Sequence, residues 1–165
     1  MEIQRVDTGR RAYMPMLLIA DESEEMILRY LDRGDMYALF DGDGGARCIA
    51  VVTDEGGGEL ELKNIVVDDA FQGRGYGRAM IDHIAKTYAP THRTLSVGTG
   101  DSPLTVPFYE KCGFTRDHVV PNFFIDNYDH PMIEEGVQLI DMVYFKRPLG
   151  PENSGENTSP DTRRA

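Results

Sequence analysis

Apolar and polar residues alternate along the chain with two different periods, and these periods predict the order of its elements. Apolar residues at helical spacing predict helices at residues 15–19, 24–31, 75–88 and 108–112. Short apolar runs predict strands at residues 3–6, 36–40, 47–53, 59–67, 94–97, 114–120 and 137–145. The order predicts a mixed α/β (α+β) domain, in which helices are inserted between the strands of a mostly antiparallel sheet.

Glycine and proline mark the expected ends of several elements. The glycine-rich segments 41–45 and 56–58 predict tight turns between strands that follow one another. Pro90 ends the helix at 75–88, and Gly113 stands where a helix C-cap favours glycine. The segment 98–100, Gly-Thr-Gly, is expected to end the strand at 94–97.

The apolar residues of the strand at 59–67 change face part-way along it. Leu60 and Leu62 are apolar at even positions, whereas Ile65 and Val67 are apolar at odd positions. Because side chains alternate with a period of two, this change of phase requires either an extra residue or a change in burial. A β-bulge near Asn64 is one interpretation, and bulges tend to lie beside active sites. A strand end buried on both faces is the other.

The length and the hydrophobic pattern bound the organisation of the chain. A chain of 165 residues is enough for one domain with a substantial core. From residue 148 onward the apolar pattern stops, so we predict a folded domain at 1–147 and a disordered C-terminal tail at 148–165. No apolar run approaches the roughly 20 residues that cross a bilayer, and the N-terminus lacks the apolar core of a secretion signal. No membrane partner is expected.

Charge and cysteine content narrow the classes of partner. The net charge is −11 and no cluster of Lys and Arg stands out, which argues against a nucleic-acid partner. Such acidity attracts cationic ligands, for example a protonated amine, or serves solubility alone. Cys48 and Cys112 lie inside apolar patterns without metal-ligand spacing. They predict a reduced, cytoplasmic protein without a metal site.

The segment 72–78, Gln-Gly-Arg-Gly-Tyr-Gly-Arg, carries the most specific chemistry. Closely spaced glycines at a helix N-terminus allow backbone amides to converge on a pyrophosphate. The P-loop pattern is absent, and a dinucleotide fingerprint fails because positions 78 and 80 are Arg and Met where a third glycine is needed. A tight turn without a ligand is the alternative interpretation.

Two segments together resemble the GNAT superfamily of N-acetyltransferases. Gln72, Gly75 and Gly77 match the Q/R-x-x-G-x-G/A signature that opens the coenzyme A helix of that family. About 30 residues later, the segment 108–114 looks like the second signature, commonly Y-E-K-x-G-F. The resemblance covers residues 36–146 and is strongest from 60 to 115. It implies a GNAT-like sheet that is splayed at the site of its cosubstrate, acetyl-CoA.

The resemblance also implies which residues bind acetyl-CoA. In the family the pantetheine arm pairs with the strand before the glycine loop, which implicates Ile65, Val66 and Val67. The pyrophosphate lies on the loop itself, which here comprises Gln72, Gly73, Arg74, Gly75, Tyr76, Gly77 and Arg78. Many members carry an Asn that contacts coenzyme A before the second signature. This chain departs from that pattern with Asp101 and Ser102, of which Ser102 is the candidate contact because an Asp is unfavourable near phosphates.

Two residues are candidates for the proton transfers. Tyr109 occupies the position of the family's usual general acid, which protonates the departing sulfur, and a phenol is protonated at neutral pH. A tyrosine that only packs on its short helix is the alternative. Glu61 has the spacing of the catalytic glutamate of histone-type members and is the candidate base, with Glu59 as the fallback. An exposed strand carboxylate, with water as the relay, is the alternative for Glu61.

The acceptor side is less specific. The long connection 121–136 combines aromatic and acidic side chains, which suits a cationic amine but also a loop pinned by its aromatics; they are Phe123, Phe124, Tyr128, Asp126, Asp129, Glu134 and Glu135. The resemblance thus implies transfer of an acetyl group to a small-molecule or peptide primary amine by direct attack in a ternary complex. An acyl-CoA sensor without turnover and a dinucleotide-dependent redox enzyme are the alternatives. A homodimer stays open.

Overall fold

The computed structural model describes residues 1–42 and 44–150. Of the predicted tail, residues 151–165 lie outside the described residues, whereas Pro148 ends a strand and Leu149 is buried. In chain order the elements are β1 (Glu2–Val6), η1 (Arg10–Tyr13), α1 (Met14–Ala20), α2 (Glu24–Leu31), β2 (Asp35–Phe40), β3 (Ala46–Gly56), β4 (Glu59–Val67), η2 (Asp69–Phe71), α3 (Tyr76–Tyr88), β5 (Thr94–Gly100), α4 (Val106–Lys111), β6 (Thr115–Val120), α5 (Phe123–Asn127), β7 (Met132–Glu134), β8 (Val137–Leu139) and β9 (Met142–Pro148). Among the described residues no helix is long and apolar enough to cross a membrane.

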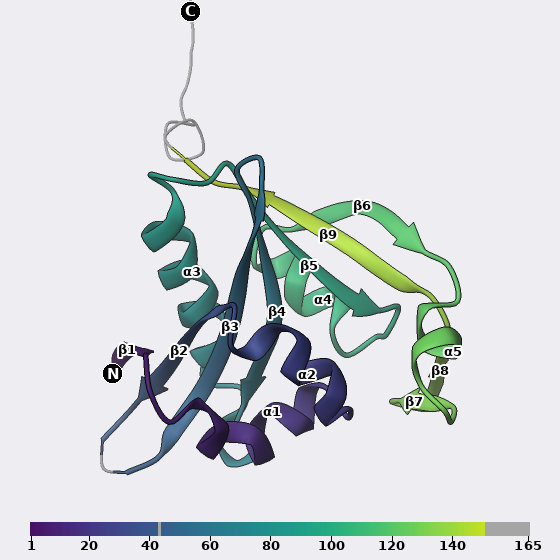
Figure 1. Ribbon diagram of the computed structural model, residues 1–165, viewed down its shortest axis with the longest axis horizontal. Coiled ribbons are helices and arrows are strands. Elements are labelled where there is room, and N and C mark those ends of the chain that lie inside the picture. Colours follow the sequence, from purple (N-terminus) through teal and green to yellow (C-terminus); the bar gives the residue numbers. More distant parts are fainter. Residues whose placement is uncertain (43, 151–165) are drawn as a thin grey trace, which may run out of the picture.

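A seven-stranded sheet forms the centre of the fold, in the order β1-β2-β3-β4-β5-β9-β6 (Figure 1). Every neighbouring pair in it is antiparallel except β4 and β5. The helices α1 and α2 pack on one face, where Leu17, Ile27 and Leu31 are fully buried. The helices α3 and α4 belong to the core of the other face, to which Met80 and Tyr109 contribute. This arrangement confirms the predicted mixed α/β fold with a mostly antiparallel sheet.

A β-bulge in β4 keeps the apolar side chains on either side of the phase change in one core. The register with β3 passes from Val52↔Leu62 to Val51↔Asn64, which leaves Lys63 as the extra residue. Leu62 belongs to the core under α3, and Ile65 and Val67, beyond the bulge, pack against that same core, whereas Val66 now faces the core under α1 and α2. The bulge predicted near Asn64 is therefore confirmed, and it explains the change of phase.

The strands β4 and β5 separate beyond the bulge. Their parallel pairing ends at Leu62↔Val97, yet β4 continues to Val67 and β5 to Gly100. Figure 1 shows the two strands diverging on the side where α1, α2 and α5 lie. The predicted splay is present, and it leaves the inner edges of both strands unpaired with each other.

The prediction that the segment 98–100 ends the strand was wrong. β5 runs to Gly100 because β9 pairs with it as far as Gly100↔Met142. These glycines provide space rather than a turn. A Cβ at Gly98 would lie 2.9 Å from the Met142 sulfur, and one at Gly100 would lie 2.7 Å from a methyl carbon of Leu139.

The single strand predicted at 137–145 was also wrong, since residues 140–141 divide it into β8 and β9. β8 pairs with β7 in a separate two-stranded hairpin. The turn of this hairpin, Glu135 and Gly136, has positive φ angles of 50° and 76°, as hairpins with two-residue turns require. The connection 121–136 is therefore ordered into α5 and β7 rather than being one long loop.

Candidate functional site

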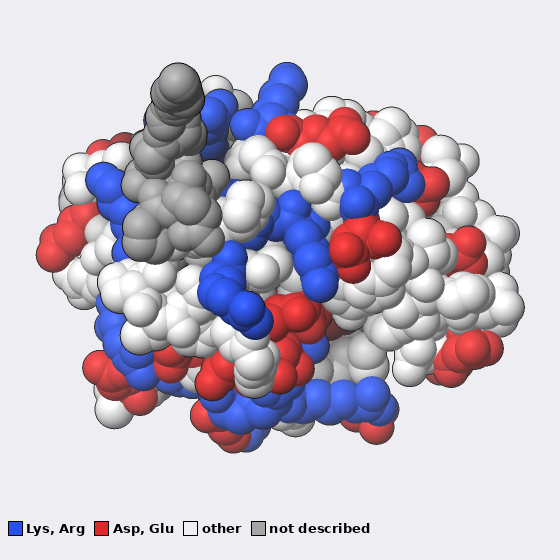
Figure 2. Space-filling view, turned by 90° about the horizontal axis from the view of Figure 1, so that it is seen from above, with Lys and Arg blue, Asp and Glu red and all other residues white. Residues whose placement is uncertain are grey.

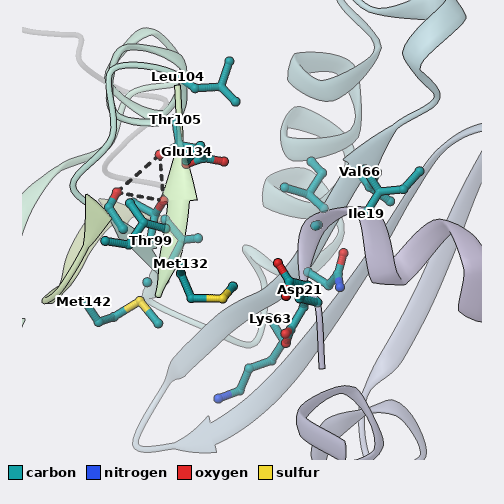
Figure 3. A pocket seen from close by; sticks show the side chains of 18 of the residues that line it. Ile19, Asp21, Lys63, Val66, Thr99, Leu104, Thr105, Met132, Glu134 and Met142 are labelled. Atoms are coloured by element: carbon teal, nitrogen blue, oxygen red, sulfur yellow. Dashed lines mark hydrogen bonds between the residues drawn. The ribbon is translucent and has the colours of Figure 1, made fainter. Parts of the chain in front are cut away.

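A cleft of about 420 Å³ opens where β4 and β5 separate (Figure 3). Its floor is formed by β4 from Leu62 to Val67 and by β5 from Val97 to Gly100. One wall is the junction of α1 and α2, and the other comprises α4, α5 and the β7–β8 hairpin. The bulge and the splay of the sheet thus create the cleft directly.

The edge of β4 in this cleft can accept an extended ligand. Ile65, Val66 and Val67 line the cleft, and β5 does not pair with them. An unpaired strand edge presents backbone N–H and C=O groups to whatever lies beside it. The structure thus places these three candidate residues along the floor of the open cleft.

The glycine loop presents backbone amides at the N-terminus of α3. Gly73 and Gly75 have φ angles of 80° and 85°, and Gly75 is the N-cap residue, without any side-chain cap. A Cβ at either glycine would meet nothing within 4 Å, so the space beside them is open. The amides of residues 76–78 lie in the first turn of α3 and have no acceptor inside the helix. Such a helix start favours an anion.

The side chains of the loop have different surroundings. Gly77 lies against α4, because a Cβ there would meet the Phe108 ring at 3.0 Å. The buried Tyr76 donates a hydrogen bond to Asp41, which raises the pKa of its phenol. Arg74 and Arg78 are exposed. Both guanidinium groups are therefore available to a charged ligand.

Gln72 and Ser102 make local hydrogen bonds. The Gln72 amide nitrogen donates to Asp69 Oδ1 at 3.1 Å, and Gln72 borders the cleft. Ser102 is 2% exposed, and its Oγ accepts a hydrogen bond from the Leu104 amide at 3.0 Å. It shapes the turn before α4 and does not line the cleft.

Two arginine side chains gather at the start of the glycine loop. At the opposite end of the molecule, on the face presented in Figure 2, basic and acidic side chains of the described residues are interspersed. Arg47 and Arg74 both lie over the Phe71 ring, at 3.9 and 4.8 Å from its centre. These cation–π contacts hold two positive charges at the start of the loop.

Tyr109 borders the cleft from α4. Its ring packs against the rings of Phe108, Phe114 and Phe145, and its hydroxyl makes no hydrogen bond within the described part of the chain. Burial raises the pKa of the phenol, and nearby Cys112 and Glu134 raise it further. The hydroxyl is thus protonated far above neutral pH and can donate a proton or a hydrogen bond into the cleft.

Glu61 lies beside the cleft rather than in its lining. Its side chain is 13% exposed and ion-pairs with Lys63 at 3.2 Å, and the Tyr144 hydroxyl donates to it at 3.4 Å. Lys63 itself lines the cleft. Glu59 is farther along β4 and pairs with Lys146 at 3.6 Å. A proton from the cleft would reach Glu61 only by way of water.

The acceptor wall contains acids that the sequence did not single out. Asp21 and Glu22, at the junction of α1 and α2, line the cleft together with Glu134. The Tyr128 hydroxyl donates to Asp21 at 2.9 Å, and His130 Nε2 lies 2.6 Å from a Glu22 carboxylate oxygen. The acidic segment 21–25 is the only local feature of the sequence that could have indicated these carboxylates. Nothing in it indicates that Tyr128 and His130, more than 100 positions away, lie beside them.

Comparison with known proteins decides the family. A family model described as acetyltransferase (GNAT) domain matches residues 32–116. The chain belongs to the GNAT acetyltransferase family. Over 148 residues it is 34% identical to the uncharacterized N-acetyltransferase YvbK of Bacillus subtilis (strain 168), which covers 87% of this chain and 95% of that protein.

Two solved GNAT-fold acetyltransferases are equally similar in structure. One is a Bacillus subtilis acetyltransferase in complex with CoA, at 30% identity and a TM-score of 0.82, covering 90% of this chain and 98% of that one. The other is a GNAT family acetyltransferase of Elizabethkingia anophelis with acetyl-CoA bound, at 31% identity and a TM-score of 0.82. That match covers 90% of this chain and 97% of the other.

The thiols of this GNAT chain lie away from the cleft. Cys48 and Cys112 are both free and buried, and neither lines the cleft. Burial raises the pKa of the Cys48 thiol to about 12, so it is not a nucleophile at neutral pH. Among the described residues no group of three or more His, Cys, Asp and Glu side chains is placed to hold a metal ion.

Proposed function

We propose that this protein transfers the acetyl group of acetyl-CoA to a primary amine by direct attack in a ternary complex. One observation carries the proposal. The unpaired edge of β4 lines a cleft that Tyr109 borders and that reaches Gln72, at the start of the loop before α3. An extended donor with a pyrophosphate at one end and a thioester at the other matches that arrangement. CoA bound to one relative of similar structure and acetyl-CoA bound to another support the same reading.

The donor half of the site divides into two parts. The amides of Ile65, Val66 and Val67 pair with the pantetheine arm and orient the thioester carbonyl. The loop from Gln72 to Arg78 holds the pyrophosphate, with amides from Gly73 onward and charge from Arg74 and Arg78. Ser102 contributes by fixing the turn that carries α4.

Acetyl-CoA supplies an activated acetyl group, and the side chains of this chain move the protons. The amine nitrogen forms a bond to the acetyl carbon, and the carbon–sulfur bond breaks. Tyr109 gives its hydroxyl proton to the departing sulfur. The proton lost by the nitrogen goes to Glu61 through water, or directly to Glu134, which lines the cleft near Tyr109.

Direct attack agrees with the residues of the cleft. A covalent acetyl-enzyme needs an activated nucleophile, and both cysteines are buried outside the cleft. Direct attack requires the amine and the donor to be bound together. The opening between the α1–α2 junction and the β7–β8 hairpin leads to the separated strands, so the acceptor enters there.

Replacing Gly75 by alanine tests the pyrophosphate site. We expect the Kd for acetyl-CoA to rise on the order of tenfold or more, because a left-handed alanine costs about 1–2 kcal/mol and its methyl group enters the open space beside the amides. Calorimetric titration with acetyl-CoA measures this. Gly9→Ala is the matched control, since Gly9 also caps a helix at positive φ with open space around it. Equal affinities of the two variants would contradict the proposed site.

A further inference from the structure

Two acidic side chains face each other across the cleft. Figure 3 shows Asp21 on one side of the cleft and Glu134 on the other, with open space between them. Among the described residues neither carboxylate forms an ion pair, and the one lysine of the lining, Lys63, pairs with Glu61. The acceptor half of the cleft therefore has two negative charges that the protein does not neutralise.

Asp21 is held in place by neutral donors. The Tyr128 hydroxyl donates to its Oδ1 at 2.9 Å, and the Ser23 amide donates to the same oxygen at 3.2 Å. Burial and the Asp21 carboxylate both raise the pKa of Tyr128 and of the adjacent Tyr30. These contacts fix the orientation of the carboxylate without supplying the positive charge that would neutralise it.

Buried hydrogen bonds join the bulge of β4 to α1 and α2, beside this carboxylate. The Asn64 side-chain amide donates to the Tyr30 hydroxyl at 3.0 Å and to the Leu17 carbonyl at 3.2 Å. Asn64 lines the cleft floor, is 4% exposed, and its Oδ1 has no hydrogen-bond donor among the described residues. The floor beside Asp21 thus has one unpaired hydrogen-bond acceptor, Asn64 Oδ1, among the described residues, and β4 is connected there to both helices of the wall.

The two acids are suited to different charges. An amine must lose its proton before it attacks. A carboxylate that lies beside the amine but does not accept this proton would stabilise the charged ammonium form instead. Glu134 lies near Tyr109, because it affects that phenol's pKa, and so belongs to the reacting end of the acceptor. Asp21 lies across the cleft and, being fixed and without a counter-charge, suits a positive charge that does not react.

Apolar side chains line part of the space between the two acids. Ile19, Met132 and Met142 are among them, and the flexible thioether of Met132 points into the opening (Figure 3). We propose that the acceptor is an amine with a second, non-reacting positive charge at the far end of a short apolar chain, and that Asp21 binds this charge. The inference rests on the proposed acetyl transfer. The class of acceptor is α,ω-diamines and other amines that carry a second positive charge.

Matched pairs of amines test the inference. A series of α,ω-diaminoalkanes is compared with 1-aminoalkanes in which a methyl group replaces the second ammonium, and thiol release from acetyl-CoA gives kcat and KM. We expect the best diamine to exceed its monoamine in kcat/KM by about tenfold to a hundredfold, mainly through KM, as a charge-assisted contact provides. In Asp21→Asn this ratio should fall close to one.

Controls separate the inference from the proposed function. Asp126→Asn, an exposed acid on α5 outside the cleft lining, should keep the wild-type ratio. Titration of Asp21→Asn with acetyl-CoA shows whether the donor site is intact. Equal use of diamines and monoamines by the wild type, or a ratio that Asp21→Asn does not change, overturns the inference and leaves the proposed function standing. Absence of acetyl-CoA binding in the wild type overturns the proposed function itself.

Discussion

Replacing Tyr109 by phenylalanine should lower kcat by about a hundredfold or more, because general acid catalysis contributes roughly 10²–10⁴-fold. The ring packs among three phenylalanines, and phenylalanine can keep these contacts. The hydroxyl makes no hydrogen bond within the described residues, so its removal breaks no contact of the fold. The affinity for acetyl-CoA should therefore change by less than about twofold, which is below 0.5 kcal/mol. Steady-state kinetics and calorimetric titration measure the two effects separately.

The pH profile and a second tyrosine provide the controls for this result. Because burial raises the pKa of Tyr109 above the ordinary tyrosine value of about 10, its deprotonation should not reduce the wild-type rate below that pH. Tyr13→Phe removes a hydroxyl that also makes no hydrogen bond within the described residues, and it should retain the wild-type kcat. A Tyr109→Phe variant with unchanged kcat rules out Tyr109 as the acid.

Replacing Asn64 by leucine should lower the free energy of unfolding by about 2–4 kcal/mol, since each buried polar group left without its partner costs about 1–3 kcal/mol. Leucine is close to asparagine in length but cannot donate to the Leu17 carbonyl or the Tyr30 hydroxyl. Both groups lie on the helices that form the α1–α2 wall of the cleft. The same substitution should therefore raise KM for the acceptor. Urea denaturation measures the loss of stability.

An exposed asparagine is the matched control. Asn127 also donates from its side-chain amide to a backbone carbonyl, that of Phe123, but it lies on the surface of α5. Asn127→Leu should change the unfolding free energy by no more than about 0.5 kcal/mol. If Asn64→Leu is as stable as Asn127→Leu, the buried connection between the bulge and the acceptor wall does not stabilise the fold.

Local periodicity predicted correctly those elements whose bounds are determined by their own residues rather than by contacts with distant parts of the chain. The helix Glu24–Leu31 and the strand Glu59–Val67 have the predicted bounds, and the phase change in that strand predicted the bulge. The error at residues 98–100 has a cause outside the local sequence. Gly98 and Gly100 resemble a strand end in sequence, but β9 and the β7–β8 hairpin, which come later in the chain, provide the side chains that occupy the space beside them.

The two halves of the cleft also differed in how much of each could be predicted from the sequence. The donor half is built from a strand, a turn and a helix that follow one another, so one stretch of sequence indicated it. The acceptor half joins Asp21 to Tyr128 across 107 positions. The aromatic and acidic side chains around Tyr128 suited either an amine site or a loop pinned by its aromatics, and only the folded chain brings the α1–α2 junction against them.

The most direct test of the account is the release of free thiol from acetyl-CoA by the purified protein across a panel of primary amines. The account predicts thiol release that depends on the amine and saturates in both substrates. Its double-reciprocal plots should intersect, because donor and acceptor bind together before transfer. Tight binding of acetyl-CoA with no amine raising thiol release would contradict the proposed acetyl transfer and favour an acyl-CoA sensor. Binding of NAD without binding of acetyl-CoA would contradict the proposed donor site as well.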